Sequence, residues 1–337
     1  MANDLTPAGP KSAIEAFVEK LNLPEMIAGP AGKAISRLVA GAVEIPAAYL
    51  DSFAQSIKDK TEAKTLVNKE VASAAAKLAA GDSDIVARAA HNLLAKEYRH
   101  QKNKEDIARR TIEILQEETK ALPAPDQQVS ASPGPVDDDW LNVFEQYAEK
   151  ASNARMQDLW ARILAGEIRS PKAFSLKTLR FVSELDQETA KLFEKYAPFI
   201  CNREAIPTPD ELEGETLDEL LHLQESGLLS GVGGLISQII ELSDDGKFVI
   251  INQSRGIFIL GKPQQKINLK CALLTKTGIE IAKLIKIPYD PTATQEIVMR
   301  IPKGGIELIA RAKFKTGTDD KTVKNVIPGE TLWASKP

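Results

Sequence analysis

The residues best suited to contact a charged ligand form a cationic cluster between residues 88 and 110. Seven Lys and Arg residues stand there against three acids, which leaves a local excess of four positive charges. Such groups pair with phosphates, so the cluster is a candidate contact for nucleic acid or for anionic lipid. A charge run on a helix is also typical of a solvated face, and this alternative stays open. The cluster comprises Arg88, Lys96, Arg99, Lys102, Lys104, Arg109 and Arg110.

No residue pattern predicts catalysis or a bound cofactor. Neither a Ser/His/Asp nor a Cys/His arrangement nor a carboxylate pair can be recognised. The glycines between residues 231 and 234 lack the GxxxxGK[ST] spacing of a phosphate-binding loop. The three histidines are remote from Cys201 and Cys271, which argues against zinc. We therefore expect no catalytic, cofactor-binding or metal-binding residues, and a protein that is not an enzyme.

The elements around residues 156–200 have the most explicit boundaries in the chain. Apolar residues recur with helical spacing from Met156, and Gly166 with Pro171 predicts that this helix ends near Ala165. Ser175 and Asp186 are the expected N-caps of two further short helices. The stretch therefore predicts a compact helical unit.

Two charged residues lie beside this motif. Glu167 and Arg169 either form a functional surface or make a salt bridge that fixes the end of the helix. Trp160, about two turns earlier, is expected in the core.

The segments LWARILAGEI and FSLKTL, with a short Pro-containing gap between them and a D-x-E-x-A-x-x-F helix start after them, resemble a family of uncharacterised bacterial proteins. The similarity covers roughly residues 137–200 most specifically. It extends more distantly to the abortive-infection alpha-like proteins, which implies an effector role in antiviral defence against phage. The resemblance implies no catalytic residues.

A chain of 337 residues exceeds the size of most single cores, so we expect several domains. Four prolines in the polar stretch 119–136 predict a flexible linker. We predict a helical N-terminal region over 1–118, a central helical unit over 137–203 and an α+β domain over 204–337. The expected fold class is mainly α with a C-terminal α+β, winged-helix-like domain.

The N-terminal region reads as a series of helices. These are expected at 12–21, at 31–54 with a kink at Pro46, in a helical hairpin over 57–98, and at 107–115. Small residues in the 31–54 helix and alanine stripes after it favour self-association through residues 31–115. Contact with an anionic membrane surface is the lesser option.

The C-terminal domain changes from helical to β periodicity. A capping box at Thr216 and Glu219 predicts a helix, FVIIN and IFILG a hairpin, and INLKCALL a further strand. Helices are expected after Thr275 and Asp290, and a closing strand at 306–314, with a loosely held tail from about residue 315.

The order of these elements resembles the winged-helix regulators of bacteria. The stretch SGVGGLISQII, where their recognition helix would lie, contains no cation to reach phosphates or bases. Protein contact is therefore favoured over DNA contact for this domain.

The composition of the chain bears on its cellular location and on its partners. The net charge of −4 argues against a whole-protein polyanion binder, and two cysteines without CxxC spacing suit a reducing cytoplasm. No signal peptide is expected, and charges and prolines interrupt residues 27–50, the one candidate membrane segment. We expect a cytoplasmic, membrane-associated or free, non-enzymatic interaction or effector protein that forms homo-oligomers and contacts protein partners. The alternative is a DNA-binding regulator that uses the C-terminal domain.

Overall fold

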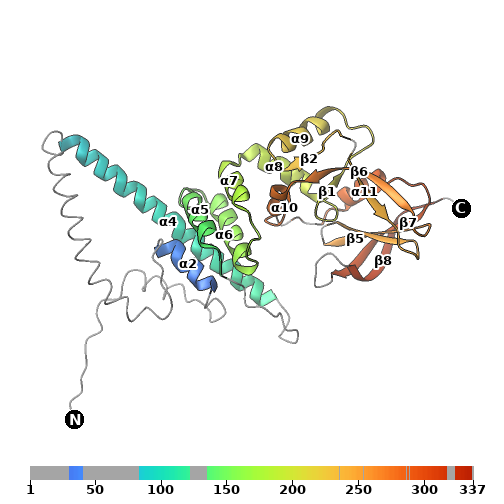
Figure 1. The fold of residues 1–337 in the computed structure, drawn as a ribbon, viewed down its shortest axis with the longest axis horizontal. Helices are drawn as coiled ribbons and strands as arrows, with labels where there is room; N and C mark the ends of the chain where they lie inside the picture. Colours follow the sequence, from blue (N-terminus) through green and yellow to red (C-terminus); the bar gives the residue numbers. More distant parts are fainter. Residues whose placement is uncertain are drawn as a thin grey trace, which may run out of the picture. The chain divides into compact units, whose positions relative to one another are not determined.

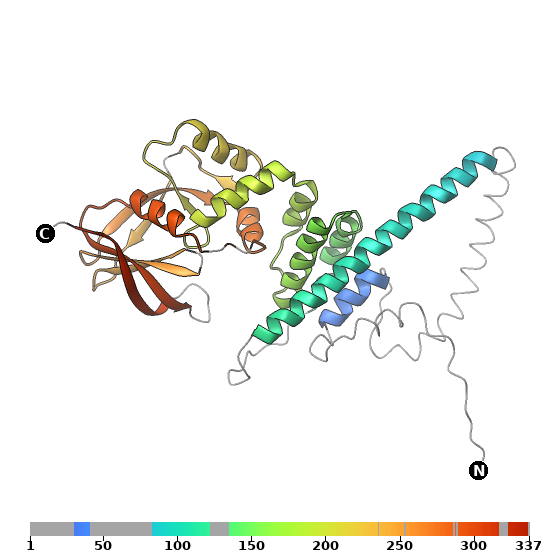
Figure 2. The same ribbon diagram turned by 180° about the vertical axis from the view of Figure 1, so that it is seen from behind.

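A computed structural model of the chain describes residues 30–40, 83–121, 135–234, 236–252, 254–285, 287, 289–316 and 323–335. The chain divides into two compact units, Met1–Leu179 and Arg180–Pro337 (Figures 1 and 2). This division falls inside the stretch 137–203 that the sequence predicts as one helical unit.

The first unit contains the helices α2 (Pro30–Ala40), α4 (Ser83–Ala121), α5 (Asp138–Ala148) and α6 (Ala154–Arg169). Helix α7 (Leu176–Glu184) follows. In Figure 1, α2, α5 and α6 lie along the C-terminal half of α4, and its N-terminal half extends beyond them. The sequence predictions at 12–21, 41–54 and 57–82, and most of the predicted linker, lie outside the described residues.

Helix α4 corrects a prediction. It is continuous over 39 residues, whereas the sequence pattern placed separate helices before residue 98 and after residue 107. The stretch between these positions contains neither Gly nor Pro, so the helix has no local reason to stop. The irregular stripe reflects a change in what covers the helix, not a break in it.

An aromatic cluster forms the core of the first unit. The rings of Trp140 and Phe144 stack at 5.2 Å, and Trp160 meets Phe144 edge-on at 5.3 Å. Trp160 is buried, as predicted. The indole N–H of Trp140 donates to the carbonyl of Phe174 at 2.7 Å, which fixes the loop between α6 and α7 against α5.

Helix α6 ends four residues later than predicted, at Arg169 instead of Ala165. Gly166 lies inside the helix and does not terminate it. A Cβ atom at this position would lie 2.6 Å from Cε2 of Phe174. The glycine is therefore explained by close packing of a ring against the helix backbone, a tertiary cause that helix-stop rules do not contain.

The helices of the second unit begin largely where the sequence predicts. Helix α8 (Gln187–Tyr196) is capped by Asp186, whose carboxylate accepts from the N–H of Thr189 at 2.8 Å, and the 3₁₀ turn η3 (Ala197–Phe199) follows. Thr275 caps α10 (Lys276–Ala282), and Asp290 caps α11 (Pro291–Arg300). Each cap satisfies N–H groups that a helix leaves unpaired in its first turn.

The capping box predicted for α9 (Gly214–Glu225) is wrong. The helix begins two residues before Thr216, and its N-cap, Glu213, makes no side-chain capping bond. Its C-terminal end is as predicted, because Gly227 adopts a φ of +83°, which glycine tolerates without strain.

Antiparallel sheets make up the rest of this unit, so its α+β class is confirmed. In one sheet, β6 (Lys266–Leu274) pairs with β1 (Ala205–Pro207), β2 (Leu229–Ser230) and β3 (Ser237–Glu241). The other sheet has the order β4 (Lys247–Asn252), β5 (Arg255–Gly261), β7 (Ile306–Thr316) and β8 (Val323–Ala334). The predicted hairpin is β4–β5, and the tail predicted to be loosely held instead provides β8.

The core of the second unit is aliphatic. Ile240, Ile257, Ile267, Ile297 and Ile309 are among its buried residues, drawn from both sheets and from α11. Helix α11 thus packs on a sheet face, which positions the loop that precedes it and the pocket at its C-terminal end.

Candidate functional site

The cationic cluster predicted from the sequence lies entirely on α4, but the structure divides it in two. Arg88, Lys96, Arg99 and Lys102, in the N-terminal half of the helix, are exposed.

The cations further along α4 are engaged within the first unit. Lys104 pairs with Glu145 of α5 at 2.8 Å, Arg109 pairs with Asp106 at 2.7 Å, and Arg110 is half-buried. Lys104 therefore helps hold α4 against α5, whereas Arg109 pairs within α4 and its side chain stays 57% exposed. The first four positions form the group of exposed cations that precedes these contacts along the helix.

Large apolar side chains are exposed beside these first four cations. The exposed fractions are 55% for Ile85, 59% for Leu93, 72% for Leu94 and 71% for Tyr98. We call Ile85, Arg88, Leu93, Leu94, Lys96, Tyr98, Arg99 and Lys102 the α4 surface.

Helical geometry relates this surface to the core. Leu93 and Leu94 precede Thr111 and Ile112 by 18 residues each, which is about five full turns at 3.6 residues per turn. Thr111 and Ile112 are buried. The side of α4 that is buried at Thr111 and Ile112 therefore continues toward the N-terminal end of the helix, where Leu93 and Leu94 lie on it and are exposed.

Glu167 is an internal residue. Glu167 is only 1% exposed. Its carboxylate accepts hydrogen bonds from the backbone N–H groups of Lys172 at 2.5 Å and Phe174 at 3.0 Å. Lys172 has a φ of +70°, so the carboxylate holds a strained turn in place. This burial removes Glu167 from any exposed surface.

Arg169 connects two helices. Its guanidinium lies 3.0 Å from the carboxylate of Glu118 on α4, and its Nε donates to the carbonyl of Ala165 at 3.2 Å. Both residues named beside the sequence motif therefore have structural partners that account for them.

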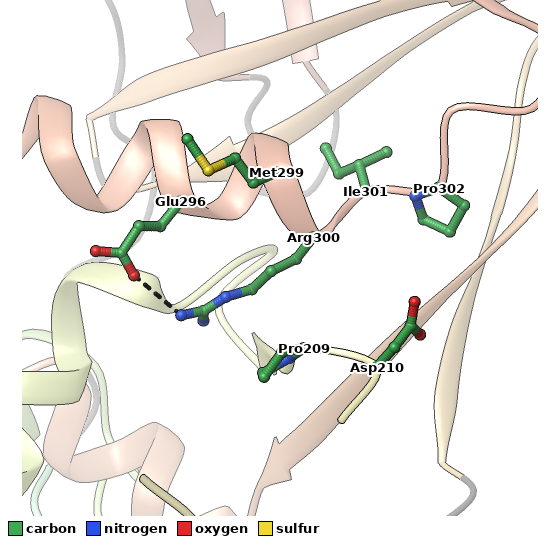
Figure 3. Close-up of a pocket in the computed structure, with 7 residues that line it drawn as sticks. All are labelled: Pro209, Asp210, Glu296, Met299, Arg300, Ile301 and Pro302. Carbon is green, nitrogen blue, oxygen red and sulfur yellow. Dashed lines mark hydrogen bonds and ion pairs between the residues drawn. The ribbon is translucent and has the colours of Figure 1, made fainter. Parts of the chain in front are cut away.

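A pocket of about 430 Å³ lies in the second unit beside the C-terminal end of α11. Figure 3 shows Arg300 extending from that helix toward Glu296 and Pro209, with Asp210 on the far side. The lining residues are Pro209, Asp210, Glu296, Met299, Arg300, Ile301 and Pro302.

The guanidinium of Arg300 is fixed before any ligand binds. It donates to the carbonyl of Pro207 at 2.7 Å and to the carboxylate of Glu296 at 3.0 Å, and it lies 4.9 Å from the centre of the Phe199 ring. Burial lowers the pKa of Arg300, although the nearby Glu296 carboxylate opposes that change. Two of its nitrogens are thus engaged within the protein, and Met299, at 70% exposure, adds an apolar side chain to the rim of the pocket.

A polar cluster joins α8 and α9. The carboxylate of Glu219 accepts from the Tyr196 hydroxyl and from the Lys195 ammonium, each at 2.6 Å. Burial and the hydrogen bond to Glu219 raise the pKa of Tyr196. Thr189 and His222 make a second link at 2.9 Å. All of these groups are occupied with one another, so the cluster is a structural clamp.

Sequence reasoning missed the pocket, because it is assembled from residues near 209 and near 300 that no motif connects. Within the described ranges, no group of three or more His, Cys, Asp or Glu residues is arranged to hold a metal ion. The helices seen there also include none with the length and apolarity needed to cross a bilayer.

The structure thus combines a helical unit and an α+β unit, and one long helix exposes large apolar side chains beside cations. Residues 87–208 match the model of a family described as "Protein of unknown function (DUF2806)". The match confirms the expected resemblance to an uncharacterised domain family. No curated protein and no solved structure matches the chain.

Proposed function

We propose that this protein is a non-enzymatic interaction protein that self-associates through the α4 surface. We further propose that it acts as an effector in abortive-infection-type defence against phage. The first half rests on the exposed leucines of α4, and the second rests on the resemblance of the central motif.

The observation that carries self-association is the continuation of the packed side of α4. At its C-terminal half this side is covered by the helices of its own unit, and at its N-terminal half Leu93 and Leu94 are exposed. Residues 83–102 extend roughly 30 Å at 1.5 Å per residue, long enough for a helix–helix contact. A second copy of α4 offers the same apolar stripe, so pairing of two copies would cover both stripes at once.

Most cations of the α4 surface lie away from this stripe. Lys102 follows Leu93 by nine residues, which places the two on opposite sides of the helix. Lys96, three residues after Leu93, lies at the edge of the stripe instead. Two paired helices would therefore keep most of their positive charges in solvent. An anionic membrane is the competing occupant, since an interfacial helix also separates apolar and cationic sides.

The alternative function, a DNA-binding regulator with a winged-helix-like C-terminal domain, has less support. Residues 229–230 and 237–241 are strands, in the stretch where a recognition helix would lie. A recognition helix in the major groove would need cationic side chains that reach phosphates and bases, and this stretch contains none.

Light scattering on the full chain between about 1 and 100 µM tests self-association, since Kd values in this range are typical of modest interfaces. The double variant Leu94→Glu, Tyr98→Glu should become monomeric, because it places charge in the shared stripe. Leu176→Glu is the matched control, since Leu176 is also an exposed helical leucine but lies outside the α4 surface. It should leave the mass unchanged.

Three further arms separate the alternatives. A full chain that is monomeric at 100 µM (about the upper limit of the assay) but pellets with phosphatidylserine vesicles would replace the second copy with a membrane. Salt-sensitive binding to duplex DNA would favour the regulator. Phage plaquing on cells with the wild-type gene, the Leu94/Tyr98 variant or no gene tests the defence role, and equal plaquing on all three would reject it.

A further inference from the structure

Two arginines of the second unit lie against one tyrosine ring. The guanidinium carbon of Arg255 lies 5.2 Å from the centre of the Tyr289 ring, and that of Arg311 lies 5.8 Å from it. Arg255 begins β5, Arg311 lies on β7, and Tyr289 belongs to the connection that leads into α11.

The strand register explains why these groups meet. Ile257 pairs with Arg311, and Arg255 lies two residues before Ile257. Because strand side chains alternate between faces, Arg255, Ile257 and Arg311 project from the same face of the sheet. Ile257 is buried in the core beneath α11, so the arginines lie where this core gives way to solvent.

The positive charge of the cluster is only partly balanced. Arg311 pairs with Glu330 of β8 at 2.6 Å, and that carboxylate is largely exposed. Among the residues that the structure describes, Arg255 has ring contact with Tyr289 and no ion pair. The cluster thus has two guanidiniums and one paired carboxylate, and the exposed Lys313 lies two residues beyond Arg311.

Two buried polar atoms of the cluster also lack partners within the described part of the chain. These are the hydroxyl oxygen of Tyr289 and Nε of Arg311. Native structures rarely leave buried donors unpaired, so a missing acceptor is the usual explanation. Both atoms belong to the same cluster as the unbalanced guanidinium of Arg255.

We propose that Arg255, Tyr289 and Arg311 form a binding site for a phosphate group. A phosphate carries up to two negative charges and three acceptor oxygens, which suits two guanidiniums and a phenol better than a carboxylate does. Arginine presents a planar fork of donors that matches phosphate geometry. The site lies in the second unit and is independent of the α4 surface.

Isothermal titration of the full chain with inorganic phosphate tests the site. Wild-type protein should bind in a saturable manner, and Arg255→Gln and Arg311→Gln should each weaken binding at least about tenfold. Tyr289→Phe keeps the ring and removes the hydroxyl, so it should weaken binding by about threefold, within the range of a neutral hydrogen bond. Lys247→Gln is the matched control, because it removes one charge at the opposite end of the same β4–β5 hairpin. It should bind as the wild type does.

A parallel titration with a single-stranded oligothymidylate identifies the source of the phosphate. Oligonucleotide binding that inorganic phosphate displaces and that Arg255→Gln removes assigns the site to a nucleic-acid backbone. Saturable binding of inorganic phosphate alone assigns it to a small phosphorylated molecule. The proposal is overturned if neither probe binds, or if binding survives in both Arg255→Gln and Arg311→Gln. Thermal unfolding of each variant verifies that a loss of binding is not a loss of fold, and Tyr289→Phe provides the readout if an arginine variant does not fold.

Discussion

Gly166→Ala should destabilise the protein, although the same change in an exposed helix interior normally stabilises it. Gly166 lies within α6, where alanine is favoured over glycine by about 1 kcal/mol. Against this gain, the new Cβ would lie 2.6 Å from Cε2 and 3.2 Å from Cζ of Phe174. The sign of the effect therefore depends on whether the Phe174 ring can move away.

The surroundings of Phe174 restrain that movement. Its N–H donates to the buried carboxylate of Glu167 at 3.0 Å, and its carbonyl accepts from the Trp140 indole at 2.7 Å. The ring itself is buried. Overpacking at a restrained site costs about 1–3 kcal/mol. After the helix gain is subtracted, Gly166→Ala should lower the free energy of unfolding by about 1 kcal/mol, within a range from about zero to 2.

A double-mutant cycle tests the reasoning. Phe174→Leu removes Cε2 and Cζ, the nearest atoms, so Gly166→Ala in that background should stabilise by about 1 kcal/mol. Urea unfolding followed by tryptophan fluorescence reports on this site, because Trp140 and Trp160 both lie in its aromatic core. Stabilisation by Gly166→Ala in the wild-type background would falsify the packing account, as would the same effect in both backgrounds.

Three further changes have expected outcomes. Glu167→Ala should lower the free energy of unfolding by about 2–4 kcal/mol in urea, since one buried and one part-buried N–H group lose their acceptor, and Glu167→Gln should cost less. Burial raises the pKa of Glu219, but hydrogen bonds from Lys195 and Tyr196 outweigh it and hold this pKa below its usual value of 4.5. The resulting stability is present above that value and is lost as pH falls through the lower folded pKa, so acid unfolding of Glu219→Gln should depend less on pH in that window. Thr275→Ala should cost about 1 kcal/mol in thermal unfolding through the lost N-cap of α10, and an unchanged midpoint would contradict that role.

Features that depend on neighbours in sequence were predictable. Asp186, Thr275 and Asp290 cap helices because a short polar side chain reaches N–H groups two or three residues ahead. The β4–β5 hairpin was predictable for the same reason, since two β-branched runs are joined by a short turn.

Features that depend on contacts between residues far apart in the sequence were not predictable. The sequence alone predicts a helix stop at Gly166, and only the packing of the Phe174 ring against this position explains the glycine. Pro328 and Gly329 disfavour a strand, yet β8 lies at the edge of its sheet, where proline removes no interior hydrogen bond. The pocket and the Arg255–Tyr289–Arg311 cluster likewise depend on strand register and on the position of α11, which no local pattern encodes.

The extent of the family match separates the two proposals. Residues 87–208 include Leu93, Leu94 and Glu167 but end well before Arg255. A property common to proteins that share this stretch can depend on the α4 surface, whereas it cannot depend on the phosphate site. Self-association is therefore the property to compare among such proteins, and phosphate binding is the one to expect only where the arginines and the tyrosine are also present. If both occur in this chain, the α4 surface supplies assembly and the second unit supplies ligand recognition, so each can be removed by substitution without altering the residues of the other.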